Sequence, residues 1–328
     1  MLTNNEKVYI TDKYVTWKPG KIHYWESLPV AMPDNPASEK LAEESKTKPA
    51  LVLIHGYAAS VEHWRRTFAG LKGRYRIYAL DLLGFGLSDK PGGNTTRYTA
   101  ELWARQAYDF LKHKKEEKVV ICGHSMGGMV ALQFGKEHPE MLEGLILVDA
   151  SGLPDQGQAE AQGQGRTRKG FDFGEFSFNM IKTPLVGETM AAVLTSSNWV
   201  IERSLRQAYY NPAKVTPQLA EQFTSPLRTP GARDSYLAIT RNFAEYQLPL
   251  KPGDLKAKTL IIWGQYDRTM PPAVMLPRWQ KLLPQAQTFV AENTGHCPQD
   301  ERPDLVNPQI IRFMETLLAA VSTQANQA

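Results

Sequence analysis

The fold is decided by one stretch, Val119-Val120-Ile121-Cys122-Gly123-His124-Ser125-Met126-Gly127-Gly128, which predicts a buried strand, a sharp turn and the start of a helix. Its Gly-x-Ser-x-Gly pattern places Ser125 at the tip of the turn. Glycines on both sides leave room for neighbouring backbone that larger side chains would fill. A glycine-rich turn with an incidental serine is the alternative, but the flanking strand and helix argue against it. We therefore identify Ser125 as the candidate nucleophile.

An acyl-transfer nucleophile needs two N–H donors that stabilise the negative oxygen of the tetrahedral intermediate. The amide of Met126 follows the serine at the start of a helix and supplies the first donor. An earlier apolar strand ends in His55-Gly56, so the amide of Tyr57 is the candidate second donor. For His55 itself we expect a structural role, as a buried histidine that hydrogen-bonds loop backbone.

A serine hydroxyl also needs a general base, and the base needs a carboxylate that orients it. Asp267 comes just after the strand Thr259–Trp263, at the sheet edge where sites collect in parallel sheets. His296 follows the last strand, so we predict that it is the base and that Asp267 is the acid. Asp149 also ends a strand and remains the rival acid. We expect structural roles for three further polar residues, His124, Asp81 and Asp300.

Apolar runs alternate with amphipathic stretches along the chain, which predicts an α/β protein with a mostly parallel sheet. The strand-like runs are Ala50–Ile54, Tyr75–Leu80, Lys118–Cys122, Leu142–Val148, Thr259–Trp263 and Thr288–Ala291. Helices are expected over Ala100–Lys112 and Met126–Glu137, the second ending before Pro139. Residues 31–49 are rich in proline, glutamate and lysine and are expected to form a solvated loop.

No strand-like run occurs between residues 151 and 250, a stretch too long for a bare loop. We expect a helical cap at 151–250, inserted between two parts of one α/β domain at 1–150 and 251–328. An aromatic cluster lies early in this segment, and its members are Phe171, Phe173, Phe176, Phe178 and Met180. The cluster either packs the cap onto the domain or forms an apolar wall that binds substrate.

With these motifs in place, the chain resembles the α/β-hydrolase family over residues 50–150 and 255–320. The order Ser125, Asp267, His296 is the order of that family. The resemblance implies an eight-stranded, mostly parallel sheet with flanking helices and an inserted helical cap. Asp81–Pro91 and Gly295–Pro303 are most similar to capped hydrolases of cyanobacteria and plastids. That branch includes pheophytinase-like and dephytylase-like enzymes, which implies an ester of a long-chain alcohol.

The residue type at the turn also separates relatives within the family. Haloalkane dehalogenases and epoxide hydrolases of this fold use aspartate there, so Ser125 argues against their reaction. Carbon–carbon bond hydrolases and cofactor-free perhydrolases or haloperoxidases share the serine and remain alternatives. A hormone-receptor-like relative that binds a ligand without turnover is the non-enzymatic alternative. We expect a carboxylic ester hydrolase whose substrate is a small-molecule apolar ester, with an acyl or long-chain alcohol group.

Composition limits the partners and the location. The 38 basic residues nearly balance the 34 acidic ones, for a net charge of +4, so we expect no nucleic-acid partner. The apolar runs are too short for a transmembrane segment, although the cap could touch a membrane transiently. With only Cys122 and Cys297, we expect free, mostly buried thiols in a reducing, cytoplasmic compartment. We find no sequence motif for a metal or a cofactor.

Overall fold

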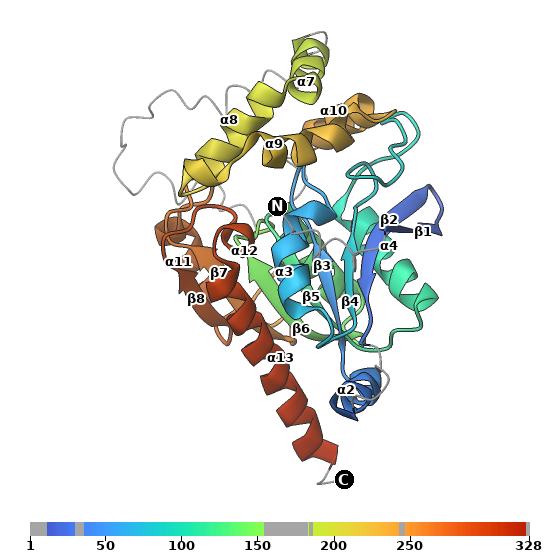
Figure 1. Ribbon diagram of the computed structural model, residues 1–328, viewed down its shortest axis with the longest axis vertical. Helices are drawn as coiled ribbons and strands as arrows, with labels where there is room; N and C mark the ends of the chain where they lie inside the picture. The colour runs from blue at the N-terminus through green and yellow to red at the C-terminus, as the bar shows by residue number, and fades with distance from the viewer. Residues whose placement is uncertain (1–11, 30–35, 154–182, 184–185, 243–246, 326–328) are drawn as a thin grey trace.

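The computed structural model describes residues 12–29, 36–153, 183, 186–242 and 247–325. Eight strands form one sheet in the order β1-β2-β4-β3-β5-β6-β7-β8 (Figure 1). Their bounds are β1 Asp12–Thr16, β2 Lys21–Ser27, β3 Ala50–Ile54, β4 Ile77–Leu80, β5 Val119–His124, β6 Leu142–Val148, β7 Lys258–Gly264 and β8 Gln287–Ala291. Strand β2 pairs antiparallel with β1 and β4, and the other pairs are parallel. The predicted fold class is confirmed.

Helices cover both faces of the sheet, which explains why its central strands are apolar throughout. On one face lie α4 (Ala100–His113), α5 (Met126–Glu137) and α11 (Pro272–Leu282). On the other lie α3 (Arg65–Leu71) and α13 (Pro303–Ala325). Alternate residues of β3 therefore enter two different apolar clusters, and every residue of β3 is buried.

Local sequence signals set the ends of the helices that flank the site. The Thr99 side chain accepts a hydrogen bond from the Leu102 amide, which caps α4. Helix α5 begins directly after Ser125 and ends at Glu137, because the following residues lead into Pro139. Two short elements complete the core, the 3₁₀ turn η1 (Val61–Trp64) and α12 (Pro298–Glu301).

The expectation of a loop over residues 31–49 was wrong for most of its length, because α2 spans Pro36–Thr47. Glutamate and lysine are strong helix formers, and proline is tolerated at the first helical position. Charge pairs near the end of the helix support it, with Lys48 Nζ 3.0 Å from Glu44 Oε2. The composition that indicated a solvated loop belongs instead to a solvated helix.

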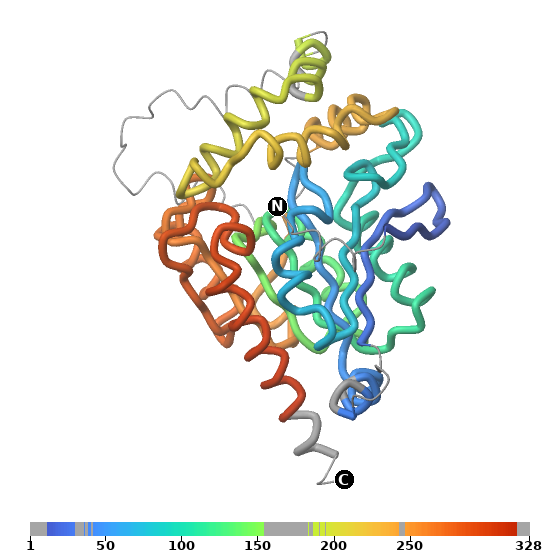
Figure 2. The backbone as a smooth tube through the Cα atoms, in the orientation of Figure 1, coloured from blue at the N-terminus to red at the C-terminus, as the bar shows by residue number. Residues whose placement is uncertain are grey.

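Of the described residues between β6 and β7, those at 186–242 form a helical insert that lies over one end of the strands (Figure 2). It comprises α7 Val186–Ser196, α8 Asn198–Ala208, η2 Pro212–Lys214, α9 Pro217–Thr224, η3 Ser225–Arg228 and α10 Ala232–Arg241. The insert meets the core through an apolar cluster of its own, in which Tyr209 and Phe223 pack with Cys297. The aromatic cluster predicted at residues 171–180 lies outside the described residues. Within the described ranges, no helix combines the length and apolar character needed to cross a bilayer.

Candidate active site

Ser125 occupies a sharp turn between β5 and α5, as the sequence pattern predicts. Its backbone has φ 51° and ψ −119°, a conformation that residues other than glycine rarely adopt. The strain is held by neighbours: the Ser125 amide donates to the Val148 carbonyl at 3.0 Å, and the Ser151 amide donates to the Ser125 carbonyl at 3.0 Å. The fold therefore presents the serine side chain at the carboxyl ends of the parallel strands.

The glycines around Ser125 are required by close backbone approach. A Cβ atom on Gly123 would lie 2.2 Å from the Gly127 carbonyl oxygen, and one on Gly127 would lie 2.3 Å from the Ile54 carbonyl oxygen. Real Cβ contacts are not this short, so neither position accepts a side chain without a backbone shift. The turn and the end of β3 are thus packed directly against each other.

His296 and Asp267 meet Ser125 from two other strand ends. The Nε2 atom of His296 lies 3.1 Å from Ser125 Oγ, and its Nδ1 lies 2.8 Å from Asp267 Oδ2. Both partners are close enough for hydrogen bonds, although 171 residues separate the serine from the histidine. The structure brings the three predicted residues together as a chain of nucleophile, base and carboxylate.

Asp267 is almost fully buried but remains well supplied with donors. Its Oδ1 accepts the amides of Thr269 at 2.8 Å and Met270 at 3.0 Å, which leaves Oδ2 for His296. Burial alone would raise the pKa of this carboxyl, but the hydrogen bond and charge of His296, together with the Met270 amide, lower the pKa below its usual value. Asp267 is therefore ionised at neutral pH and can stabilise a protonated imidazole.

The backbone of the His296 loop is held by α8 of the helical insert and by Glu301 of α12. The His296 amide donates to the Ala208 carbonyl at the end of α8 (2.8 Å). Glu301 accepts the Gly295 amide at 2.7 Å and the Tyr210 amide at 2.8 Å. Sequence reasoning missed Glu301, because only its position after the His296 turn hinted at a role. The base is thus tied to the helical insert as well as to the core.

The buried histidines predicted to be structural make backbone contacts. His124 Nε2 lies 2.7 Å from the His296 carbonyl, and burial lowers the pKa of His124 to about 3. His124 is therefore neutral and must carry its proton on Nε2 in order to donate to that oxygen. His55 donates from Nδ1 to the Gly56 carbonyl (2.7 Å) and accepts the Leu82 amide on Nε2 (3.1 Å).

The two predicted oxyanion donors belong to segments that adjoin Ser125. Met126 is the first residue of α5, directly after the serine. A Cβ on Gly56 would lie 3.1 Å from Ser125 Cβ, so the loop that carries Tyr57 lies against the nucleophile. The Tyr57 hydroxyl also hydrogen-bonds Thr240 of α10, which links this loop to the helical insert.

Asp81 and Asp300 fix loops, as expected from the sequence. Asp81 accepts the Val61 amide at 2.7 Å and the Leu87 amide at 2.8 Å. Asp300 accepts from Arg65 Nη2 at 2.9 Å and also binds the Tyr209 hydroxyl. Both carboxylates therefore join separate elements around the site.

The rival acid Asp149 does not contact Ser125 or His296 through a resolved hydrogen bond. It is fully buried, and its Oδ1 accepts the Gly264 amide at 2.9 Å. Nevertheless, a carboxylate oxygen of Asp149, a carboxylate oxygen of Asp267 and a ring nitrogen of His296 all lie within 4.8 Å of one another. The structure thus places both candidate acids beside the base but hydrogen-bonds only Asp267 to it.

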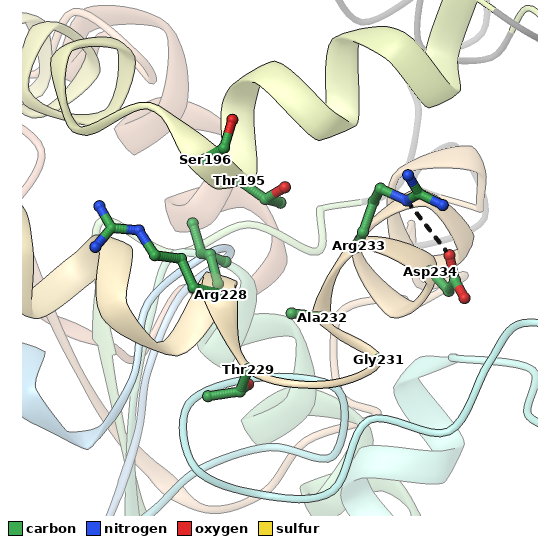
Figure 3. A pocket seen from close by; sticks show the side chains of 9 residues that line it. Thr195, Ser196, Arg228, Thr229, Gly231, Ala232, Arg233 and Asp234 are labelled. Atoms are coloured by element: carbon green, nitrogen blue, oxygen red, sulfur yellow. Dashed lines mark ion pairs between the residues drawn. The ribbon is translucent and has the colours of Figure 1, made fainter.

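A polar hollow of about 460 Å³ lies within the helical insert (Figure 3). Arg228 and Arg233 stand on opposite sides of it. Arg228 is paired with Glu221 at 3.0 Å and Arg233 with Asp234 at 3.7 Å. None of the candidate catalytic residues lines this hollow, so we do not count it as part of the active site.

The fold and the site together define the class of protein. Residues 49–303 match the sequence profile of the α/β hydrolase fold, and this chain belongs to that family. Epoxide hydrolase 3 of Xenopus tropicalis is 27% identical, over 84% of this chain and 74% of its own length. Lipase 1 of Psychrobacter immobilis is 26% identical, over 77% and 73% of the two chains.

A solved structure supports the fold assignment. The crystal structure of Cfl2 from Burkholderia cenocepacia is 19% identical and covers 93% of this chain and 96% of its own, with a TM-score of 0.73. The relatives named here carry out different reactions according to their names. Membership of the family therefore defines a hydrolase, and the choice of reaction depends on the chemistry of the site.

Proposed function

We propose that this protein is a serine hydrolase that cleaves carboxylic esters of apolar substrates. The observation that carries the proposal is the chain from Ser125 Oγ through His296, 3.1 Å away, to Asp267, 2.8 Å further. This arrangement can activate a hydroxyl at neutral pH, because His296 takes the proton while Asp267 stabilises the resulting charge. A serine at the turn also disfavours a route through an alkyl-enzyme ester on aspartate.

The reaction would proceed in two stages. His296 removes the Ser125 proton as Oγ bonds the ester carbonyl carbon, and the amides of Tyr57 and Met126 donate to the resulting oxyanion. Collapse of this intermediate breaks the bond to the alcohol, which leaves with the proton from His296. A water molecule, activated by His296 in the same way, then releases the acid and regenerates Ser125.

For the substrate we propose an ester with a long acyl or long-chain alcohol group. The resemblance of Asp81–Pro91 and Gly295–Pro303 to plastid and cyanobacterial enzymes supports the alcohol class. We propose that residues 151–250 act as the cap over the site, with the aromatic cluster from Phe171 to Met180 as an apolar wall. Each methylene buried against such a wall contributes about 0.8 kcal/mol, which favours long chains.

The proposal is tested by assaying the wild-type protein and Ser125→Ala on one panel. The panel contains p-nitrophenyl esters of graded acyl length, a phytyl ester and a vinylogous diketone as a carbon–carbon substrate. We expect ester turnover that rises with chain length and a fall of several orders of magnitude in Ser125→Ala, because its only nucleophile is gone. A fluorophosphonate probe should label the wild type at Ser125 alone.

Four outcomes would contradict the proposal. Near-normal ester turnover by Ser125→Ala, or probe labelling at another serine, would remove the mechanism. Cleavage of the diketone with no ester turnover would move the protein to the carbon–carbon hydrolases. A ligand-binding protein without turnover would process none of the panel.

A further inference from the structure

Asp149 is a buried carboxyl group for which the proposed mechanism has no use. It follows β6, has a positive φ of 40° and is fully excluded from solvent. Its Oδ1 accepts the Gly264 amide at 2.9 Å, but its Oδ2 has no hydrogen-bond donor among the described residues. A buried carboxylate oxygen without a donor costs several kcal/mol, so the ionised form fits this site poorly.

The groups that face Asp149 make ionisation still less favourable. Asp267 lies beside it after β7, and Glu301 of α12 adds a second acidic side chain. Besides burial, the charge of Asp149 is also one cause of the raised pKa of the Cys297 thiol, and His296 lies close to both carboxyl groups, with atoms of all three residues within 4.8 Å of one another. Two carboxylates this close cannot both ionise without strong repulsion, and a single shared proton removes that repulsion.

We infer that Asp149 is a positioning residue that keeps its proton and donates Oδ2–H to the carboxylate of Asp267. The inference rests on the proposed function, because Asp149 would act only through Asp267 and has no hydrogen bond to His296 or Ser125 of its own. The proton satisfies the orphaned Oδ2 and gives Asp267 a further donor besides the Thr269 and Met270 amides. The carboxylate that orients His296 is thereby held in place, and the Asp149–Asp267 pair carries one negative charge.

The direction of the two pKa shifts agrees with this division of one proton. Burial and then the charge of Asp267 raise the pKa of Asp149 well above its usual value. The pKa of Asp267 is lowered although burial opposes this, because the hydrogen bond and charge of His296 outweigh burial and the Asp149 side chain adds to them. Because the two groups titrate together, the proton belongs to the pair, and the geometry places it on Asp149.

The Asp149→Asn variant distinguishes a protonated Asp149 from an ionised one. Its amide oxygen can accept from Gly264 and its NH₂ can donate to Asp267, so Asp149→Asn imitates the protonated acid. We expect kcat/KM within about threefold of wild type and an acid limb of the pH–rate profile at the same pH. Asp149→Ala removes the donor and should lower kcat by about tenfold to 150-fold, with little change in KM, as for a lost hydrogen bond to a charged group.

Other results would overturn the inference. If Asp149 is ionised, Asp149→Asn removes a charge near His296 and moves the acid limb to lower pH by about one unit or more. An Asp149→Ala variant with wild-type kcat would show that the contact has no catalytic effect. A loss of activity on chelation, restored by a divalent ion, would show that a cation and not a proton joins the two carboxyl groups.

Two further measurements keep the test independent of folding and of the proposed function. The infrared difference spectrum between the wild type and Asp149→Asn at neutral pH should contain the band of a buried protonated carboxyl; a difference spectrum without that band would refute the inference without any assay. Asp267→Asn, which has the wrong charge at the orienting position, should lose far more activity than Asp149→Asn. Normal Ser125→Ala activity would instead overturn the proposed function, whatever the position 149 variants do.

Discussion

At the scale of single residues, His23 and Asp81 form a buried ion pair near the site. His23 Nδ1 lies 2.6 Å from Asp81 Oδ2, and its Nε2 lies 3.0 Å from Asp12. Burial would lower the pKa of His23, but the hydrogen bond and charge of Asp81, and then those of Asp12, raise it. Burial would raise the pKa of Asp81, but the hydrogen bond and charge of His23 lower the pKa below its usual value. Both groups are therefore charged together over an interval of pH.

The sign of these shifts predicts how the pair affects stability. The raised pKa of His23 gives stability that is complete below its unfolded value of about 6.5 and is lost as pH rises through the folded value. The lowered pKa of Asp81 gives stability that is present above about pH 4 and is lost in acid. Asp81→Asn should thus reduce the free energy of unfolding by about 3–5 kcal/mol at pH 6 and by less at pH 9. Urea unfolding at both values measures this difference.

A surface aspartate provides the control for this experiment. Asp234 is exposed, and Asp234→Asn should change the free energy of unfolding by less than about 0.5 kcal/mol at either pH. An equal loss at pH 6 and pH 9 for Asp81→Asn would show that the charge of His23 contributes nothing.

Site residues that directly follow a strand could be predicted from the sequence. Site residues that act through contacts between distant loops could not. Ser125, Asp267 and His296 each follow a strand of a parallel sheet, so their meeting follows from the order of the motifs. Glu301 acts on amides 91 residues away at Tyr210, and no local pattern indicates that contact. The approach of Asp149 to Asp267 is equally a product of neighbouring strand ends rather than of sequence spacing.

At the scale of elements, the turn between β5 and α5 depends on its glycines. Because a Cβ on Gly123 would meet the Gly127 carbonyl oxygen at 2.2 Å, Gly123→Ala must shift backbone that also positions Ser125. We expect a loss of at least about 1–3 kcal/mol in stability, seen as a lower melting temperature, together with reduced labelling by the fluorophosphonate probe.

Gly92 is the matched control for this substitution. A Cβ there would meet nothing within 4 Å, so Gly92→Ala should leave stability unchanged or raise it by about 0.4–1 kcal/mol. If Gly123→Ala and Gly92→Ala both melt at the wild-type temperature, then the close backbone approach at Gly123 does not limit which residue the turn accepts.

Helix α2 shows where composition fails as a guide to elements. Pro36–Thr47 contains the residues of a solvated loop and also those of a solvated helix, and it has little apolar periodicity to distinguish them. The core helices α4 and α5 were predictable almost to the residue, because their apolar faces and end signals are strong. Strand β1 lies at the edge of the sheet and β2 lies between β1 and β4, and both are less apolar in sequence than the central parallel strands, so the sequence did not indicate them.

At the scale of the whole molecule, the two cysteines lie in different apolar clusters and are free and buried. Cys122 belongs to the cluster between the sheet and α3 and α13, whereas Cys297 packs against the helical insert. Burial raises the pKa of both thiols, so neither is reactive in the folded protein. Each thiol therefore reports the opening of its own part of the molecule.

Single-cysteine variants make use of this placement. We expect Cys297, in Cys122→Ala, to react with a thiol reagent under native conditions faster than Cys122 does in Cys297→Ala. The smaller cluster under the helical insert should open in a sub-global step, whereas the core opens only on global unfolding. Both thiols should react quickly in denaturant. Equal rates under native conditions would show that insert and core unfold together.

The hydrogen bond from the His296 amide to the Ala208 carbonyl has a consequence for protein engineering. In a chimera that combines the insert of one relative with the core of another, the carbonyl that accepts from the catalytic histidine amide would come from the insert donor. The histidine itself would come from the core donor. The seam is also sterically matched, since any side chain at Gly295 would strike the Ala208 carbonyl at 2.1 Å. Residues 208–211 and 295–301 are therefore structurally matched to each other, and a chimera has to take both segments from the same parent protein.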